Sequence, residues 1–186
     1  MEALGFLDLA RCALLVVDIQ ERLMPVIAGR EEVVRNSLLL LRMAKVLGLP
    51  VLATTQYAAR IGKLLPEVAA ELGAVVPVDK MEFNCFGNAG FRAAVARLPG
   101  KVDTLLVCGV ETHICIYQTV LGGLMAGRRM WVASDGVSSR TRHNYRSGLA
   151  RIRELGGVVA NTEMMVYELL RQAGTPAFKE LLPLLK

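Results

Sequence analysis

The stretch LLVCGVETHICIY, residues 105–117, combines the end of a strand, a sharp turn and the start of a helix. Residues 102–108 form an apolar run rich in β-branched residues, which is typical of a strand buried on both faces of a parallel sheet. Gly109 interrupts this run, and apolar residues recur at helical spacing from residue 114 to residue 125. The pattern predicts a strand–turn–helix junction with Cys115 close to the helix N-terminus.

Cys115 is well placed to act as a nucleophile. Free N–H groups and the dipole at a helix N-terminus favour a thiolate there. The same N–H groups can hold the oxyanion that forms when the thiolate attacks a carbonyl. The alternative is that Cys115 packs as a small apolar residue, the commoner role of a free cysteine. If Cys115 is the nucleophile, we expect its thiol pKa to lie below that of a free cysteine.

The rest of the chain alternates strand and helix patterns on either side of this junction. We predict strands at residues 12–17, 50–54, 74–78, 102–108, 130–134 and 157–160. We predict helices at residues 31–47, 64–72, 88–98, 114–125, 141–155, 162–172 and 176–185. Six β–α units predict an α/β fold, a doubly wound (Rossmann-like) six-stranded parallel sheet with helices on both faces. No linker or repeat divides the chain, so we expect one domain over residues 1–186.

Three chemically active residues lie at the ends of three predicted strands. Asp18 ends the first strand, Lys80 follows the third and Cys115 lies just past the fourth. In the usual strand order 3-2-1-4-5-6, the order reverses between strands one and four, and ligands bind at that point beside the carboxyl ends of the strands. We therefore expect an acid, a base and a thiol to meet in one crevice.

The apolar content favours a homo-oligomer, a dimer or larger. Apolar residues make up 53% of the chain and charged residues 21%, which suggests that some surface is buried between subunits. Gly122, Gly123 and Gly127 would permit a partner to approach the helix at residues 114–127 closely. The longest uncharged stretches are shorter than the ~20 apolar residues of a membrane span. The beginning of the chain, MEALGFLDLA, lacks the basic region of a signal peptide, so we expect a cytoplasmic protein without membrane contact.

Several other classes of function find little support. The net charge of +5 is spread along the chain, and Arg142 and Arg146 fit a solvated helix face. With only 5% aromatic residues, nucleic-acid binding is not expected. No C-x-x-C pair occurs, and Cys12 and Cys108 fall in predicted core strands, so neither a disulfide framework nor a zinc cluster is favoured. No glycine-rich nucleotide motif follows the first strand.

Three blocks of the sequence resemble the signature blocks of the isochorismatase-like cysteine hydrolases. They are VVDIQ at residues 16–20, DKMEFNCFGN at residues 79–88 and CGVETHICIYQT at residues 108–119. Residues 54–68, 134–141 and 162–186 are similar to the isochorismatase domain-containing branch of unassigned hydrolases. The resemblance covers nearly the whole chain.

The resemblance implies a catalytic triad of Asp18, Lys80 and Cys115. Asp18 would take the thiol proton, Lys80 would steady the carboxylate and the thiolate, and Cys115 would attack a carbonyl or C=N carbon. The implied activity is cleavage of a small amide or related C–N bond through a thioester acyl-enzyme. The family also carries a cis peptide four residues before the nucleophile, here Val110–Glu111, whose N–H would join that of Cys115 in an oxyanion hole.

Departures from relatives refine this hypothesis. Nicotinamidases of the superfamily bind a metal through an Asp and two His residues after the second strand, whereas this chain has TTQYAARIG there. We therefore expect no metal and no cofactor. Cysteine-less isochorismatases cleave a vinyl ether with the aspartate alone, so the presence of Cys115 favours acyl chemistry.

The substrate pocket is less well defined by the sequence than the triad. Gln20, Gln56, Tyr57 and Phe83 are candidates for its lining, and each is equally compatible with a packing or turn role. His113 is a less favoured proton acceptor, because its position on the helix start points it away. A small-molecule substrate is expected, without a name for it. The alternative to an enzyme is a catalytically silent oligomeric scaffold or binding protein with the same fold.

Overall fold

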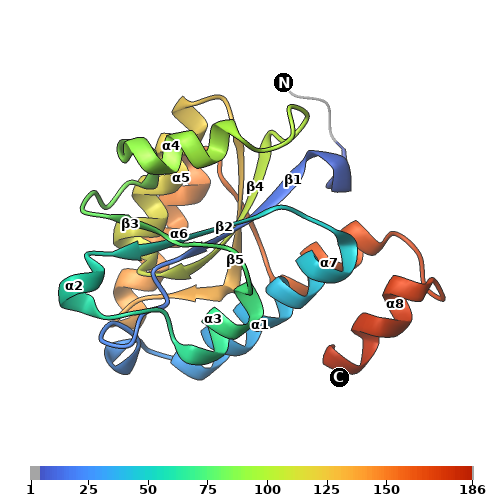
Figure 1. The fold of residues 1–186 in the computed structure, drawn as a ribbon, viewed down its shortest axis with the longest axis horizontal. Helices are drawn as coiled ribbons and strands as arrows, with labels where there is room; N and C mark the ends of the chain where they lie inside the picture. The colour runs from blue at the N-terminus through green and yellow to red at the C-terminus, as the bar shows by residue number, and fades with distance from the viewer. Residues whose placement is uncertain (1–4, 186) are drawn as a thin grey trace.

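The computed structural model describes residues 5–185, in which six parallel strands form one sheet between two layers of helices (Figure 1). The strand order is β3-β2-β1-β4-β5-β6, so it reverses between β1 and β4. This confirms the predicted fold class. Residues 1–4 and 186, which belong to the predicted domain and N-terminal segment, lie outside the described residues. The strands are β1 (Cys12–Val17), β2 (Val51–Gln56), β3 (Val78–Lys80), β4 (Thr104–Val110), β5 (Arg129–Ser138) and β6 (Val158–Ala160).

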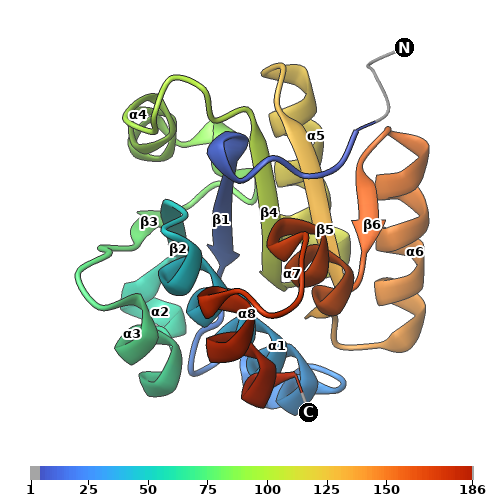
Figure 2. The ribbon, with the colours of Figure 1, turned by 90° about the vertical axis from the view of Figure 1, so that its right-hand side faces the viewer.

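Helices cover both faces of the sheet (Figure 2). One face is covered by α4 (Ala89–Ala96), α5 (Tyr117–Met125) and α6 (Arg142–Glu154). The other is covered by α1 (Arg30–Leu47), α3 (Pro66–Leu72) and α7 (Thr162–Leu170), while α8 (Pro176–Leu181) packs outside α1. A short helix, α2 (Ala58–Ile61), follows β2. Among residues 5–185, no helix combines the length and apolar character needed to cross a bilayer.

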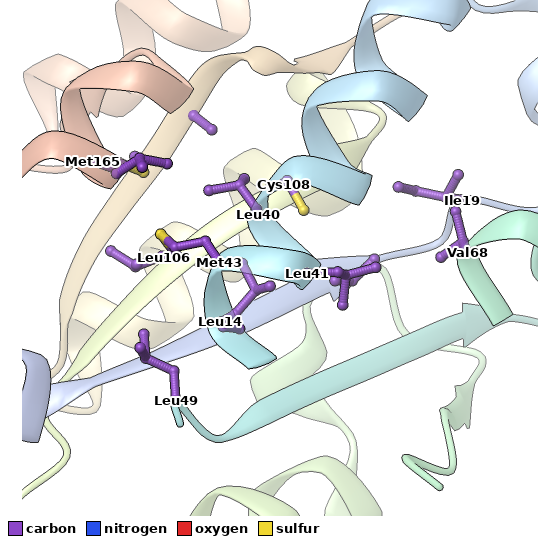
Figure 3. Packing of buried hydrophobic residues seen from close by; sticks show 14 of the residues in the cluster. Leu14, Ile19, Leu40, Leu41, Met43, Leu49, Val68, Leu106, Cys108 and Met165 are labelled. Atoms are coloured by element: carbon purple, nitrogen blue, oxygen red, sulfur yellow. The ribbon is translucent and has the colours of Figure 1, made fainter. Parts of the chain in front are cut away.

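The sheet separates two apolar cores, as expected for strands buried on both faces. All six residues of β1 are buried, and they alternate between the two sides because successive side chains of a strand point to opposite faces. On one side, Leu14 packs with Leu40 and Met43 of α1 and Leu106 of β4 (Figure 3). On the other side, Leu15 joins the cluster that α4, α5 and α6 supply. The two central strands are thereby fixed from both faces.

The backbones of β1 and β4 approach closely at their carboxyl ends. Val17 pairs with Gly109, whose φ is +118°. A Cβ at Gly109 would collide with the carbonyl oxygen of Val17, and an L side chain rarely adopts this φ. Gly109 therefore lies within β4 instead of ending it, contrary to the prediction. The close approach brings the residues after β1 next to those after β4.

The third strand was placed wrongly by the sequence pattern. The prediction was residues 74–78, whereas β3 is Val78–Lys80 and pairs with residues 54–56 of β2. Pro77 has no N–H to donate to a ladder, so pairing begins only after it. Lys80 is consequently the last residue of the strand. The fifth strand also extends further than predicted, to Ser138, with a register irregularity against β4.

The helix predicted from residue 114 begins with a different geometry. Thr112–Ile116 forms a π-helical turn, and α5 continues from it. Such turns recur at functional sites. Gly122 and Gly123 face the interior, where a Cβ would collide with the side chains of Asn84 and Met130. The expectation that these two glycines serve a partner subunit is therefore wrong, because they accommodate neighbours within the same chain.

Candidate active site

Asp18 and Lys80 meet at the carboxyl edge of the sheet. Asp18 directly follows β1 with a φ of +54°, a left-handed conformation that Asp tolerates better than most residues. Lys80 ends β3, two strands away. Lys80 Nζ lies 2.7 Å from Asp18 Oδ2, and both side chains are 0% exposed. The sequence thus predicted the proximity of these two residues correctly from their places at strand ends.

Both oxygens of the Asp18 carboxylate are satisfied. Oδ2 accepts from Lys80, and Oδ1 accepts from the hydroxyl of Thr54 at 2.7 Å. Burial alone would lower the pKa of Lys80, but the negative charge of Asp18 raises it, with help from Cys85 and Cys115, so that the net shift is upward. Lys80 is therefore a protonated cation in the resting site.

Cys115 lies beside this ion pair on the π-helical turn. The residue is 6% exposed. Burial raises the pKa of its thiol most, the charge of Asp18 raises it further, the charge of Lys80 lowers it, and a hydrogen bond to Asp18 raises it. The balance is upward, so the predicted lowering of this pKa is wrong for the resting site. A helix end and one cation do not outweigh burial and an adjacent carboxylate.

A second thiol, Cys85, lies in the same place and was not foreseen. Its backbone N–H donates to Thr119 Oγ1 at 3.0 Å, and Thr119 is one helical turn after Cys115. Burial raises the pKa of the Cys85 thiol to about 11, while Lys80 lowers it and Asp18 raises it. Both Cys85 and Thr54 fall inside sequence blocks that carry the family resemblance. Their contacts with Asp18 and Lys80 join segments far apart in the sequence, however, and no spacing along the chain reveals them.

The turn after β4 supplies the backbone of the predicted oxyanion hole. The Val110–Glu111 peptide bond is cis. The carboxylate of Glu111 accepts from Arg140 N at 2.9 Å and Arg140 Nε at 3.1 Å, which directs that side chain toward the segment after β5. His113 Nδ1 lies 3.0 Å from Ser139 Oγ. The side chains of Glu111 and His113 are thus both engaged by residues 139–140.

The four predicted pocket residues do not form one lining. Gln20 is buried, and it bonds the backbone of Gln56 and Gly62. The side chain of Gln56 bonds Lys80 Nζ at 2.7 Å. Tyr57 and Phe83 are 38% and 52% exposed. The two glutamines therefore lie behind Lys80, and of these four residues Tyr57 and Phe83 are the ones open to solvent. Within residues 5–185, no group of three His, Cys, Asp or Glu side chains is placed to hold a metal ion.

A sheet with polar groups gathered where the strand order reverses places the chain among the doubly wound α/β proteins. Within this class, the isochorismatase domain model matches residues 12–164. Two relatives are similar over 93% of the chain. The secreted isochorismatase effector Isc1 of Phytophthora sojae is 35% identical, with 83% of its length covered. The mouse isochorismatase domain-containing protein 2A is 34% identical, with 82% covered. The chain belongs to the isochorismatase domain family.

Solved structures share the fold at lower identity. YcaC from Pseudomonas aeruginosa, with hexane-2,5-diol and covalent acrylamide, has a TM-score of 0.91 at 24% identity, covering 99% of this chain and 93% of that one. YcaC of Escherichia coli, described as an octameric hydrolase of unknown specificity, has a TM-score of 0.90 at 23% identity, covering 99% and 92%. A cysteine hydrolase of Pseudomonas syringae reaches 0.77 at 19%, covering 92% and 99%. Similarity at this level establishes the common fold.

Proposed function

We propose that this protein is a metal-independent cysteine hydrolase that cleaves a small amide or related C–N bond through a thioester acyl-enzyme. The observation that carries the proposal is the fully buried Asp18–Lys80 pair beside the thiol of Cys115. A buried ion pair is costly to maintain, and acid, cation and nucleophile in contact are the groups that acyl transfer requires.

The first half of the reaction forms the thioester. Asp18 accepts the thiol proton as the sulfur of Cys115 bonds to the carbonyl carbon of the substrate. The carbonyl oxygen becomes an oxyanion, for which the backbone N–H groups of Glu111 and Cys115 are the proposed donors. The C–N bond then breaks, and the departing nitrogen takes the proton from Asp18. Lys80 keeps its proton throughout and offsets the negative charge that moves between carboxylate and sulfur.

The second half uses one water molecule. Asp18 takes a proton from water while the water oxygen attacks the thioester carbon. The C–S bond breaks, the carboxylic acid leaves and the proton returns to sulfur. The raised thiol pKa is compatible with this cycle, because the resting enzyme stores the proton on Cys115 and leaves Asp18 free to act as base.

The comparisons support the proposal without assigning the chemistry to this chain. A cysteine hydrolase shares its fold, and one YcaC structure contains covalent acrylamide, an electrophile of the kind that thiols attack. The octameric neighbour supports a homo-oligomer. The cytoplasmic location stays a prediction, and one relative is named a secreted protein.

The test is a screen of purified protein against small amides, ureides and imides. With a substrate in hand, Cys115→Ala should lower turnover by about 10³-fold or more, and mass spectrometry of quenched wild-type enzyme should detect the acyl group on Cys115. Exhaustive chelation should leave turnover unchanged. Undiminished turnover in Cys115→Ala would remove the nucleophile. An unreactive Cys115 with no substrate found would favour the oligomeric scaffold.

A further inference from the structure

Lys80 has one more N–H than its observed partners use. The ammonium group carries three N–H donors. One donates to Asp18 Oδ2 and another to Gln56 Oε1, each at a distance of 2.7 Å. Among residues 5–185, no other side chain or carbonyl accepts the third, which leaves it for the sulfur of Cys115 or for a substrate atom. Its direction is set by where the first two donors are held.

The amide of Gln56 is fixed in a single orientation. Its Nε2 donates to the carbonyl of Met81 at 2.8 Å, so that Oε1 must face Lys80. The backbone of the same residue is clamped by Gln20, whose Oε1 accepts from Gln56 N at 2.7 Å and whose Nε2 donates to Gln56 O at 3.1 Å. Gln20 Nε2 also donates to Gly62 O at 2.7 Å. A continuous chain of hydrogen bonds thus runs from the α2 turn to the triad.

We propose that Gln56, held by Gln20, is a positioning residue that sets the place of the Lys80 ammonium beside Cys115. This inference rests on the proposed function and refines it. A neutral amide gives Lys80 an acceptor without adding a second anion, so Asp18 alone offsets the positive charge that a thiolate would meet. A carboxylate at the same place would hold the ammonium and cancel part of that charge. The two glutamines therefore act on the nucleophile through Lys80 and do not line the substrate pocket.

The surroundings of Lys80 decide how the effect is measured. The titratable groups that face it are Asp18 from β1, Cys85 after β3, Cys115 on the π-helical turn and the exposed Glu82. Alkylation of Cys115 by iodoacetamide reports thiolate formation at this site without any knowledge of the substrate. Peptide mapping separates Cys115 from Cys85.

The experiment measures the alkylation rate of Cys115 from about pH 7 to about pH 10, on both sides of the ordinary thiol pKa of about 8.5. Gln56→Met, of similar length, removes the acceptor, and Gln56→Glu keeps an acceptor but adds a charge. Both should slow alkylation by about tenfold at a given pH, equivalent to about one unit of thiol pKa. Lys80→Met is the reference for complete loss of the cation.

Thr55→Val is the matched control. Thr55 precedes Gln56 on β2, is equally buried, and donates one hydrogen bond to Asp79 Oδ1 at 2.9 Å on the opposite face. Its profile should superimpose on that of the wild type. Superimposed profiles for both Gln56 variants, with slowed alkylation only in Lys80→Met, would overturn the positioning role, even if thermal stability fell. If Gln56→Met does not fold, the alkylation profile of Gln56→Glu alone tests the positioning role. An unchanged Lys80→Met profile would instead contradict the triad itself.

Discussion

At the scale of single residues, the protonation state of the Cys115 thiol matters most. Burial and the charge of Asp18 both favour the neutral thiol, and the single cation Lys80 does not reverse them. The site therefore resembles a loaded acid–base pair more than a standing thiolate. In the proposed mechanism, the thiol therefore loses its proton to Asp18 as the sulfur attacks, and Lys80 offsets the negative charge that forms.

This protonation state has a direct consequence for alkylation in the wild type. Because the pKa of Cys115 is raised, its thiolate fraction should still be climbing at pH values where a free thiol, with a pKa of about 8.5, has levelled off. Iodoacetamide labelling of Cys115 should rise about tenfold per pH unit through about pH 9. A plateau below about pH 8 would instead indicate a thiolate already present at neutral pH.

The Asp18–Lys80 pair should be sensitive to the loss of either partner. Lys80→Met leaves the Asp18 carboxylate buried without a counter-charge, which costs about 3–5 kcal/mol in comparable sites. Urea unfolding should show this loss, and the double variant Asp18→Asn, Lys80→Met should recover much of it, since no charge is then left uncompensated. Equal stability of Lys80→Met and the wild type would contradict the burial of this pair.

The sequence predicts that Asp18, Lys80 and Cys115 meet, because Asp18 and Lys80 lie at strand ends and Cys115 lies in the turn after β4, all at one edge of the sheet. It does not predict Thr54 or Cys85 as neighbours of Asp18, since those contacts depend on the side-chain directions of segments far apart along the chain. It also misjudges the pKa of Cys115, because the depth of burial depends on packing that no local pattern encodes.

At the scale of elements, strand and helix order is readable while boundaries are not. Apolar runs show that a strand exists, but Pro77 shifts the pairing of β3 toward Lys80, and pairing with β1 carries β4 through Gly109. The π-helical turn at Thr112–Ile116 has no separate periodicity in so short a segment. These features position Lys80 and Cys115, and each is decided by contacts with a neighbouring strand or helix.

Gly109 offers a test at this scale. Gly109→Ala places a methyl group against the carbonyl of Val17 and forces a φ of +118° on an L residue, so β1 and β4 must move apart. We expect a loss of several kcal/mol in urea unfolding, or an insoluble protein. Gly127→Ala is the control, because Gly127 has a φ of +73° but no atom within 4 Å of the added Cβ. That variant should lose only about 1 kcal/mol. Equal effects would show that conformation alone matters at Gly109.

At the scale of the whole molecule, large apolar side chains remain exposed on the single chain. Val76, Met81 and Met125 are each more than 60% exposed, and apolar surface of this kind favours burial against a second copy of the chain. We expect a homo-oligomer, and light scattering at micromolar concentration should give a multiple of 20.2 kDa. A measured mass of about one chain would contradict this.

Stability should decline at alkaline pH. Burial chiefly raises the pKa values of the thiols of Cys12, Cys85 and Cys108, to about 11, 11 and 12 respectively. Above about pH 9, the folded protein therefore retains thiol protons that the unfolded chain has lost. The free energy of unfolding falls as the pH rises from there toward the pKa values of the folded state, by up to about 1.4 kcal/mol per pH unit for each thiol. Urea midpoints at about pH 8 and about pH 10 should show the fall. Cys108→Ala should make it shallower, and an equally steep decline in that variant would remove this thiol as a cause.

The central pairing of β1 with β4 also determines when the reactive site comes into existence. These strands lie far apart along the chain, with Cys12 opposite Thr104, and closing so long a loop delays contact. Until that happens, the four thiols remain in a chain with ordinary acidity, and they are more vulnerable to electrophiles than in the finished protein. A brief pulse of alkylating reagent during refolding would therefore report when β1 and β4 pair. Molecules that have not yet joined the two halves of the sheet would be marked, and completed ones would be spared.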